Sequence, residues 1–202
     1  MDSCTHGLRG IVVMALLAWG TAVHGTEISV GHPAFSSDVG TTTIPIGAYQ
    51  FCKALPDECR WTGRTGDHVD LTEAAWAELQ SINDRFNTTI SPVTDRDLYG
   101  VDEYWTFPAG QGDCEDYALA KRRALVEASW PEDALLMAVV RRPDGEGHAV
   151  LIVRTDRGDL ILDNLIGRID VWNATPYEFV KRQSQVNARQ WVAIAPPLLA
   201  SL

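Results

Sequence analysis

Cys114 is the residue whose setting most clearly indicates chemistry in this sequence. It stands at the start of a helix-like stretch, Gly112-Asp113-Cys114-Glu115-Asp116-Tyr117. A cysteine becomes a strong nucleophile as the thiolate, and both a helix N-terminus and a nearby imidazolium lower its pKa. His148 and Asp163 follow on two short apolar runs, and a carboxylate can fix the orientation of an imidazole. Cys114, His148 and Asp163 in this order predict a cysteine hydrolase.

The beginning of the chain differs from the rest and predicts a secretory signal peptide. Arg9 precedes an apolar run from Gly10 to Val23, and Val23-His24-Gly25 supplies a small-residue cleavage site. The run is too short to span a bilayer, which favours a signal peptide over the alternative, a membrane anchor. We therefore expect an exported protein with a signal peptide at 1–25 and a single domain at 26–202.

The cysteine count leaves Cys114 as the odd thiol. Cys4 is removed with the signal peptide, and Cys52 and Cys59 lie in a turn-rich stretch with six residues between them. In an exported protein such a pair favours a disulfide that closes a small loop. The alternative is that Cys114 is a buried, inert cysteine. The acidic residues on both sides of it argue against that alternative.

His148 is the best candidate for a catalytic base among the histidines. The two earliest histidines leave with the signal peptide, and His32 and His68 lie in irregular polar stretches. A lone histidine at the start of a strand is more often structural. Its combination with an unpaired thiol at a helix start favours catalysis.

A register argument places a carboxylate beside His148. The apolar segments 148–154 and 159–163 flank a turn and indicate a β-hairpin. With an even number of loop residues, Asp163 lies diagonal to His148 on one face, with ~7–8 Å between the backbones. A three-residue loop would put Asn164 on that face instead. Both side chains can orient an imidazole, and we favour Asp163.

A developing oxyanion needs hydrogen-bond donors in addition to the nucleophile. The backbone N–H of Cys114, at the helix start, can supply one. Trp105 and Gln111 are candidates for a second donor, although a core position for Trp105 and a solvated one for Gln111 are the simpler assignments. The sequence leaves the second donor open.

The elements that must position these residues predict an α+β domain. One helix is expected at 70–90, begun by a capping box at Asp70 and Glu73, and the cysteine helix at 114–129. Residues 26–68 read as an irregular arm that carries the disulfide, and a loop is expected at 92–112. Apolar runs predict antiparallel strands at 134–140, 148–154, 159–163 and 191–195.

The charge of the chain limits its partners. The 202 residues carry a formal net charge of −10, and removal of the signal peptide deletes one acid and one base. Such an acidic protein is a poor match for nucleic acid or anionic lipid, whereas it could suit a divalent cation. The sequence contains neither a coiled-coil pattern nor an obvious apolar stripe, so we expect a monomer.

Four motifs follow one another along the chain and together resemble a known family. They are Tyr104-Trp105-Thr106-Phe107-Pro108, the segment from Gly112 to Lys121, His148-Ala149-Val150-Leu151, and Leu162-Asp163-Asn164-Leu165. In this order they resemble the bacterial transglutaminase-like cysteine proteinases of the LapG type. The resemblance implies a papain-like α+β fold with N-terminal helices packed on an antiparallel sheet. It also implies a Cys114, His148 and Asp163 triad and a periplasmic location.

The resemblance further implies dependence on calcium. The family positions for the metal match Asp113 and Glu115, and Asp116 could add a third oxygen. Hard carboxylate oxygens in a short acidic segment suit Ca²⁺. From the residues alone, the alternative is that Asp113 caps the helix and Glu115 complements its dipole.

The same resemblance implies a substrate and a protein partner. The substrate would be the N-terminal retention region of a very large surface adhesin, whose release disperses a biofilm. The partner would be an inner-membrane receptor that senses cyclic di-GMP and sequesters the protease. Two alternatives stay open: amidase or transglutaminase-like acyl transfer on another exported protein or cell-wall peptide, and a non-catalytic binding module.

Overall fold

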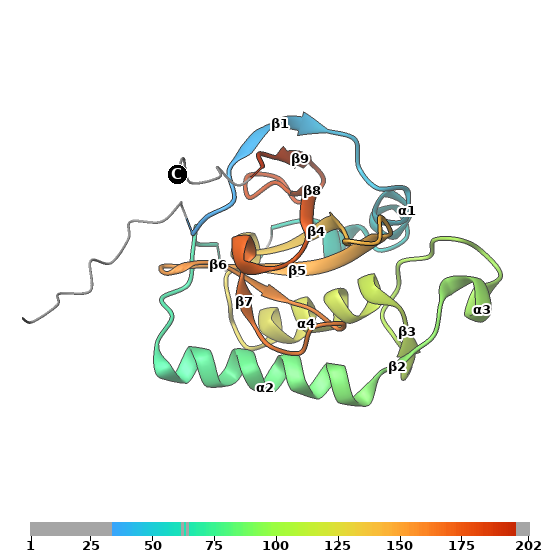
Figure 1. Ribbon diagram of the computed structural model, residues 1–202, viewed down its shortest axis with the longest axis horizontal. Coiled ribbons are helices and arrows are strands. Elements are labelled where there is room, and N and C mark those ends of the chain that lie inside the picture. Colours follow the sequence, from blue (N-terminus) through green and yellow to red (C-terminus); the bar gives the residue numbers. More distant parts are fainter. Residues whose placement is uncertain (1–33, 62, 64, 197–202) are drawn as a thin grey trace, which may run out of the picture. The chain divides into compact units, whose positions relative to one another are not determined.

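One antiparallel sheet of seven strands organises the part of the chain that the computed structural model describes, residues 34–61, 63 and 65–196 (Figure 1). The predicted signal peptide at 1–25 lies outside the described residues. The strand order is β1-β9-β8-β4-β5-β6-β7, and neighbouring strands run antiparallel. The strands of this sheet are β1 Asp38–Thr42, β4 Leu135–Arg141, β5 Gly147–Thr155, β6 Gly158–Leu162, β7 Asp170–Val171, β8 Glu178–Gln183 and β9 Trp191–Ile194.

The helices cover one face of this sheet in two successive layers. Helix α4 packs on β5 and β4, and α2 packs on α4, as Figure 1 shows. A short parallel pair, β2 Ser91–Pro92 and β3 Gln111–Gly112, leads into α4. The helices are α1 Ile46–Ala54, α2 Glu73–Thr89, α3 Asp95–Tyr99 and α4 Cys114–Glu127, with single turns η1 Pro56–Cys59, η2 Glu132–Ala134 and η3 Trp172–Ala174.

The central strands are buried on both faces, which explains why their sequences are continuous apolar runs. Successive residues of β4 alternate between two core clusters, with Met137 in the cluster that contains Leu125 of α4 and Ala138 in the other. The second cluster is closed by Trp172 and Phe179 from the C-terminal part of the chain. The expected α+β fold, with helices packed on an antiparallel sheet, is confirmed.

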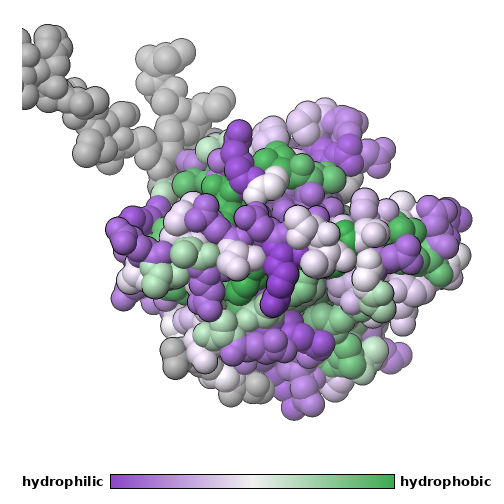
Figure 2. Space-filling view, turned by 90° about the horizontal axis from the view of Figure 1, so that it is seen from below, coloured by the Kyte–Doolittle hydropathy of each residue, from purple (hydrophilic) through white to green (hydrophobic). Residues whose placement is uncertain are grey.

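Helix α2 begins later than the sequence predicts. Its N-cap is Thr72, whose hydroxyl accepts a hydrogen bond from the N–H of Ala75 at 3.1 Å, so the expected capping box at Asp70 and Glu73 is wrong. The backbone N–H of Leu71, which precedes the N-cap, donates to Asp156 Oδ1 at 2.8 Å. Figure 2, seen from the side of α2, shows hydrophilic residues with small hydrophobic groups among them.

Two segments expected to be irregular contain regular structure. The 26–68 arm supplies β1 and α1, and the predicted disulfide between Cys52 and Cys59 is confirmed, where it joins α1 to η1. The expected loop at 92–112 contains α3, which is only five residues long. Among the described residues, no helix is both long and apolar enough to cross a membrane.

Candidate active site

The β5–β6 hairpin brings His148 and Asp163 together. Thr155 pairs with Gly158, so the loop has an even number of residues, as the register argument requires. His148 Nε2 lies 2.8 Å from Asp163 Oδ1, and their side chains are 3% and 2% exposed. Burial alone would raise the pKa of Asp163, but hydrogen bonds from His148 and Tyr177 bring it below the usual value. The pair is therefore a buried carboxylate that holds an imidazole.

The sulfur of Cys114 lies against the start of β5. Asp113 is the N-cap residue of α4 and Cys114 is its first helical residue. The backbone N–H of Ala149, next to His148, donates to Cys114 Sγ at 3.3 Å. Packing of α4 on β5 thus places the helix N-terminus at the His148 end of the strand, as the sequence led us to expect.

The environment of this thiol differs from the expectation in one respect. We expected the helix N-terminus and an imidazolium to lower the pKa of Cys114. In the structure the pKa is raised well above its ordinary value, first by burial and then by the negative charge of Glu115. The thiol donates to Glu115 Oε2 at 3.3 Å. Burial and the neighbouring Glu115 therefore outweigh the helix terminus and favour the thiol over the thiolate.

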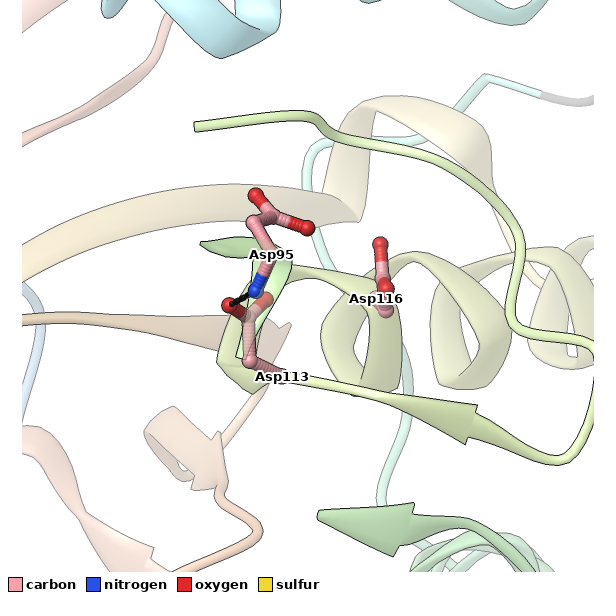
Figure 3. A group of neighbouring side chains, drawn as sticks. All are labelled: Asp95, Asp113 and Asp116. Atoms are coloured by element: carbon pink, nitrogen blue, oxygen red, sulfur yellow. Dashed lines mark hydrogen bonds between the residues drawn. The ribbon is translucent and has the colours of Figure 1, made fainter. Parts of the chain in front are cut away.

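Three aspartates, one from α3 and two from the start of α4, meet beside the cysteine. Figure 3 shows Asp95 from α3, Asp113 from the N-cap of α4, and Asp116 from the first turn of α4. Each offers a carboxylate oxygen, and these atoms all lie within 4.8 Å of one another. Asp95 Oδ1, Asp113 Oδ1 and Asp116 Oδ2 are buried and have no hydrogen-bond partner among the described residues.

Backbone hydrogen bonds hold these carboxylates in place. The N–H of Asp95 donates to Asp113 Oδ2 at 3.1 Å, shown as a dashed line in Figure 3. The N–H of Tyr104 donates to Asp95, and the N–H of Thr106 donates to Asp116 Oδ1 at 2.9 Å. One oxygen of each carboxylate is thus hydrogen-bonded to the backbone, while the other is buried without a partner among the described residues.

The donor set fits a divalent cation. Burial first, and then neighbouring acids, raise the pKa of Asp116 to about 7. The pKa of Glu115 is raised to about 10, by burial and by Asp113. Crowded buried carboxylates with unpartnered oxygens are costly unless a cation or protons compensate them. Oxygen-only ligands are typical of Ca²⁺ sites.

The cluster differs from the predicted ligand pair. Asp113 belongs to it, and Asp116, the predicted third donor, does too. Glu115 is not one of the group of three. Its Oε2 accepts from the thiol of Cys114, and its carboxylate also interacts with Asp95 and Asp113. Asp95 was missed, since it lies in the segment expected to be a loop; its one sequence signal is its place after Thr94, which caps α3.

The candidates for a second oxyanion donor are in different environments. Trp105 is 5% exposed in the core, and its indole N–H donates to Glu103 Oε1 at 2.8 Å. That donor is therefore committed in this structure. Gln111 is exposed on β3.

Comparison with known proteins identifies the family of this chain. A family model described as bacterial transglutaminase-like cysteine proteinase matches residues 38–197. The chain belongs to this family. The match covers the cysteine helix, the β5–β6 hairpin and the three aspartates, so the resemblance inferred from the four motifs is confirmed. No curated protein sequence gave a significant match.

Solved structures of LapG from Legionella pneumophila resemble this bacterial transglutaminase-like cysteine proteinase. One has 31% sequence identity and a TM-score of 0.50, and the match covers 58% of this chain and 68% of that chain. A calcium-bound LapG structure has 23% identity and a TM-score of 0.52 over 78% of this chain and 93% of that chain, which supports the fold.

Proposed function

We propose that this cysteine proteinase is a calcium-dependent endopeptidase with Cys114 as nucleophile, His148 as general base and acid, and Asp163 as the residue that orients His148. The observation that carries the proposal is the buried His148–Asp163 pair at 2.8 Å, with Cys114 Sγ accepting from the next residue along β5. A thiol, an imidazole and a carboxylate in this arrangement suit acyl transfer.

The chemistry divides into two steps. His148 takes the proton of the Cys114 thiol as the sulfur attacks the peptide carbonyl, and it returns the proton to the departing amine, which leaves a thioester. His148 then removes a proton from water, which attacks the thioester and releases the acid and the free thiol. The backbone N–H of Cys114 can donate to the oxyanion in both steps.

Calcium would be held by Asp95, Asp113 and Asp116, which offer carboxylate oxygens within 4.8 Å of one another and each have one buried oxygen without a hydrogen-bond partner among the described residues. Glu115 stands next to them and stays a candidate ligand by family resemblance. A bound Ca²⁺ would supply positive charge beside Cys114 and offset the acids that raise the pKa of its thiol. The calcium-bound structure of LapG is consistent with this proposal.

The biological setting follows from family resemblance and the sequence. We propose that the protein is exported to the periplasm and cleaves the N-terminal retention region of a large surface adhesin. Release of that adhesin would promote biofilm dispersal. An inner-membrane cyclic-di-GMP receptor would restrain the protease by sequestration.

The first test is cleavage of a purified adhesin retention fragment from the same organism. We expect cleavage by the wild type with added calcium and loss of at least about 1,000-fold in rate for Cys114→Ala and for His148→Ala. His68→Ala is the matched control, because His68 is 44% exposed and lies outside the site. Cleavage by Cys114→Ala would overturn the proposal.

A second arm of the same assay separates hydrolysis from acyl transfer. With a primary amine present, mass spectrometry of the new C-terminus shows either a free carboxylate or an amide. We expect the carboxylate. An amide as the main product would favour the transglutaminase-like alternative, and binding without any cleavage would favour a non-catalytic module.

A further inference from the structure

Tyr177 contacts both members of the buried pair. Its hydroxyl donates to Asp163 Oδ2 at 2.5 Å, on the oxygen that does not face His148. Its ring lies 5.5 Å from the His148 ring, centroid to centroid, at 56°. Tyr177 is part-buried against the second core cluster, so its ring also has a packing contact that fixes its position.

Strand pairing explains how a residue so distant in sequence reaches this pair. His148 on β5 pairs with Val140 on β4, and Val140 pairs with Phe179 on β8. Directly paired residues project to the same face of a sheet, and so do residues two apart on one strand. Tyr177 lies immediately before β8 and two residues before Phe179, so the start of β8 brings it to the face of His148, where the two rings are in contact.

Both carboxylate oxygens of Asp163 accept hydrogen bonds. Oδ1 receives His148 Nε2 at 2.8 Å and the N–H of Leu165 at 3.0 Å. Oδ2 receives the hydroxyl of Tyr177. Since Asp163 is 3% exposed, bulk water cannot replace a lost donor freely, and the carboxylate would gain freedom to rotate.

We propose that Tyr177 is a positioning residue of the triad, which fixes the Asp163 carboxylate so that Oδ1 stays directed at His148. The inference rests on the proposed function, because it assigns Tyr177 a part in the same reaction. Tyr177 acts through Asp163, to which its hydroxyl donates.

The electrostatic setting agrees with this role. Hydrogen bonds from His148 and Tyr177 oppose the effect of burial and lower the pKa of Asp163. Burial, followed by the contact with Asp163, raises the pKa of Tyr177, so its hydroxyl stays a donor. The other groups that face this pair are Lys121 from α4, which interacts with Asp163, and Arg142 and Cys114, which interact with Tyr177.

The test is the steady-state kinetics of Tyr177→Phe on the cleavable adhesin fragment, with saturating calcium. We expect kcat to fall about 10-fold, the rate equivalent of one ordinary hydrogen bond, with KM changed less than about 2-fold. We also expect the acid limb of the pH profile to move to higher pH, because Asp163 loses a donor that lowers its pKa. Tyr49→Phe is the matched control on an exposed tyrosine of α1.

Each outcome decides between roles. Wild-type kcat and pH profile in Tyr177→Phe would overturn the inference, and so would a rise in KM alone, which would indicate substrate binding. If Tyr177→Phe does not fold, fluorotyrosine at position 177 keeps the donor and makes it more acidic, and the acid limb should then move to lower pH. An unchanged limb would overturn the inference. An inactive wild type, or an active Cys114→Ala, would instead refute the proposed function.

Discussion

At the scale of single residues, Gly112 is closely fitted to the acidic cluster. A Cβ atom at this position would lie 2.4 Å from Asp116 Oδ2 and 2.8 Å from Asp116 Cβ. Asp116 is held by the N–H of Thr106, so its carboxylate cannot turn away without losing that hydrogen bond. Close packing against Asp116 therefore explains why a glycine precedes Asp113 in the cysteine motif.

Gly112→Ala should lower the free energy of unfolding by about 1–3 kcal/mol through overpacking. It should also weaken stabilisation by calcium, because Asp116 is displaced. Urea denaturation with and without calcium measures both effects. Gly167→Ala is the matched control, since a Cβ there would have no atom within 4 Å. An equal loss in both variants would contradict the argument.

Some residues of the candidate site could be predicted from the sequence and others could not. Asp163 could be favoured from the sequence, because strand alternation in a hairpin with an even loop places it on the face of His148; the loop length that excludes Asn164 comes from the structure. Asp95 and Tyr177 could not be predicted from the sequence. Asp95 lies in a segment without a helical pattern, and Tyr177 reaches the site because β8 pairs with β4, which is far away in the chain. The lowered pKa expected for Cys114 failed because burial and Glu115 act against the helix terminus.

At the scale of elements, long apolar or periodic segments were predicted and short or polar ones were not. The two long helices and strands β4, β5, β6 and β9 follow from their sequence patterns. Strand β8 was missed because its sequence, Glu178–Gln183, contains Lys181, Arg182 and Gln183, although Arg182 and Gln183 are buried. The side chains of Arg182 and Gln183 form hydrogen bonds with residues outside β8. These hydrogen bonds cannot be predicted from the local sequence.

Helix α4 carries a buried lysine. Lys121 is fully buried, and its Nζ has no hydrogen-bond partner among the described residues. Burial lowers its pKa to about 7, and Asp163 opposes that effect only in part. A lysine of this kind destabilises the fold whenever it is protonated, because the charge must be desolvated.

Lys121→Met should raise the free energy of unfolding at pH 7 by about 1–4 kcal/mol. The folded pKa of Lys121 lies below its unfolded value of 10.5, so between pH 7 and 10 the unfolded chain binds more protons. Wild-type stability at this site therefore rises with pH, and the advantage of Lys121→Met should shrink by up to about 1.4 kcal/mol per pH unit. Denaturation series at several pH values measure the difference; Lys53→Met, on an exposed lysine, is the control. An advantage independent of pH would refute this account.

At the scale of the whole molecule, the acidic cluster links parts of the chain that are separate in sequence. Asp95 on α3, the backbone at Tyr104 and Thr106, and the first turn of α4 meet there. The chain carries a net charge of −10, so repulsion opposes this meeting. A cation at the cluster would stabilise the folded state relative to the unfolded chain, in which the three carboxylates are apart.

Calcium at about 100 times its dissociation constant should therefore stabilise the protein by about 2.7 kcal/mol, which corresponds to an increase in Tm of about 5–10 °C for a domain of this size. Thermal unfolding with calcium and with a chelator measures the shift without any assay of activity. Asp95→Asn and Asp116→Asn should abolish it, whereas Asp57→Asn, whose side chain is 91% exposed, should not. Loss of the shift in Glu115→Gln would add Glu115 to the ligands. A shift that survives in Asp95→Asn would remove Asp95 from them, and the absence of any shift in the wild type would refute the calcium site.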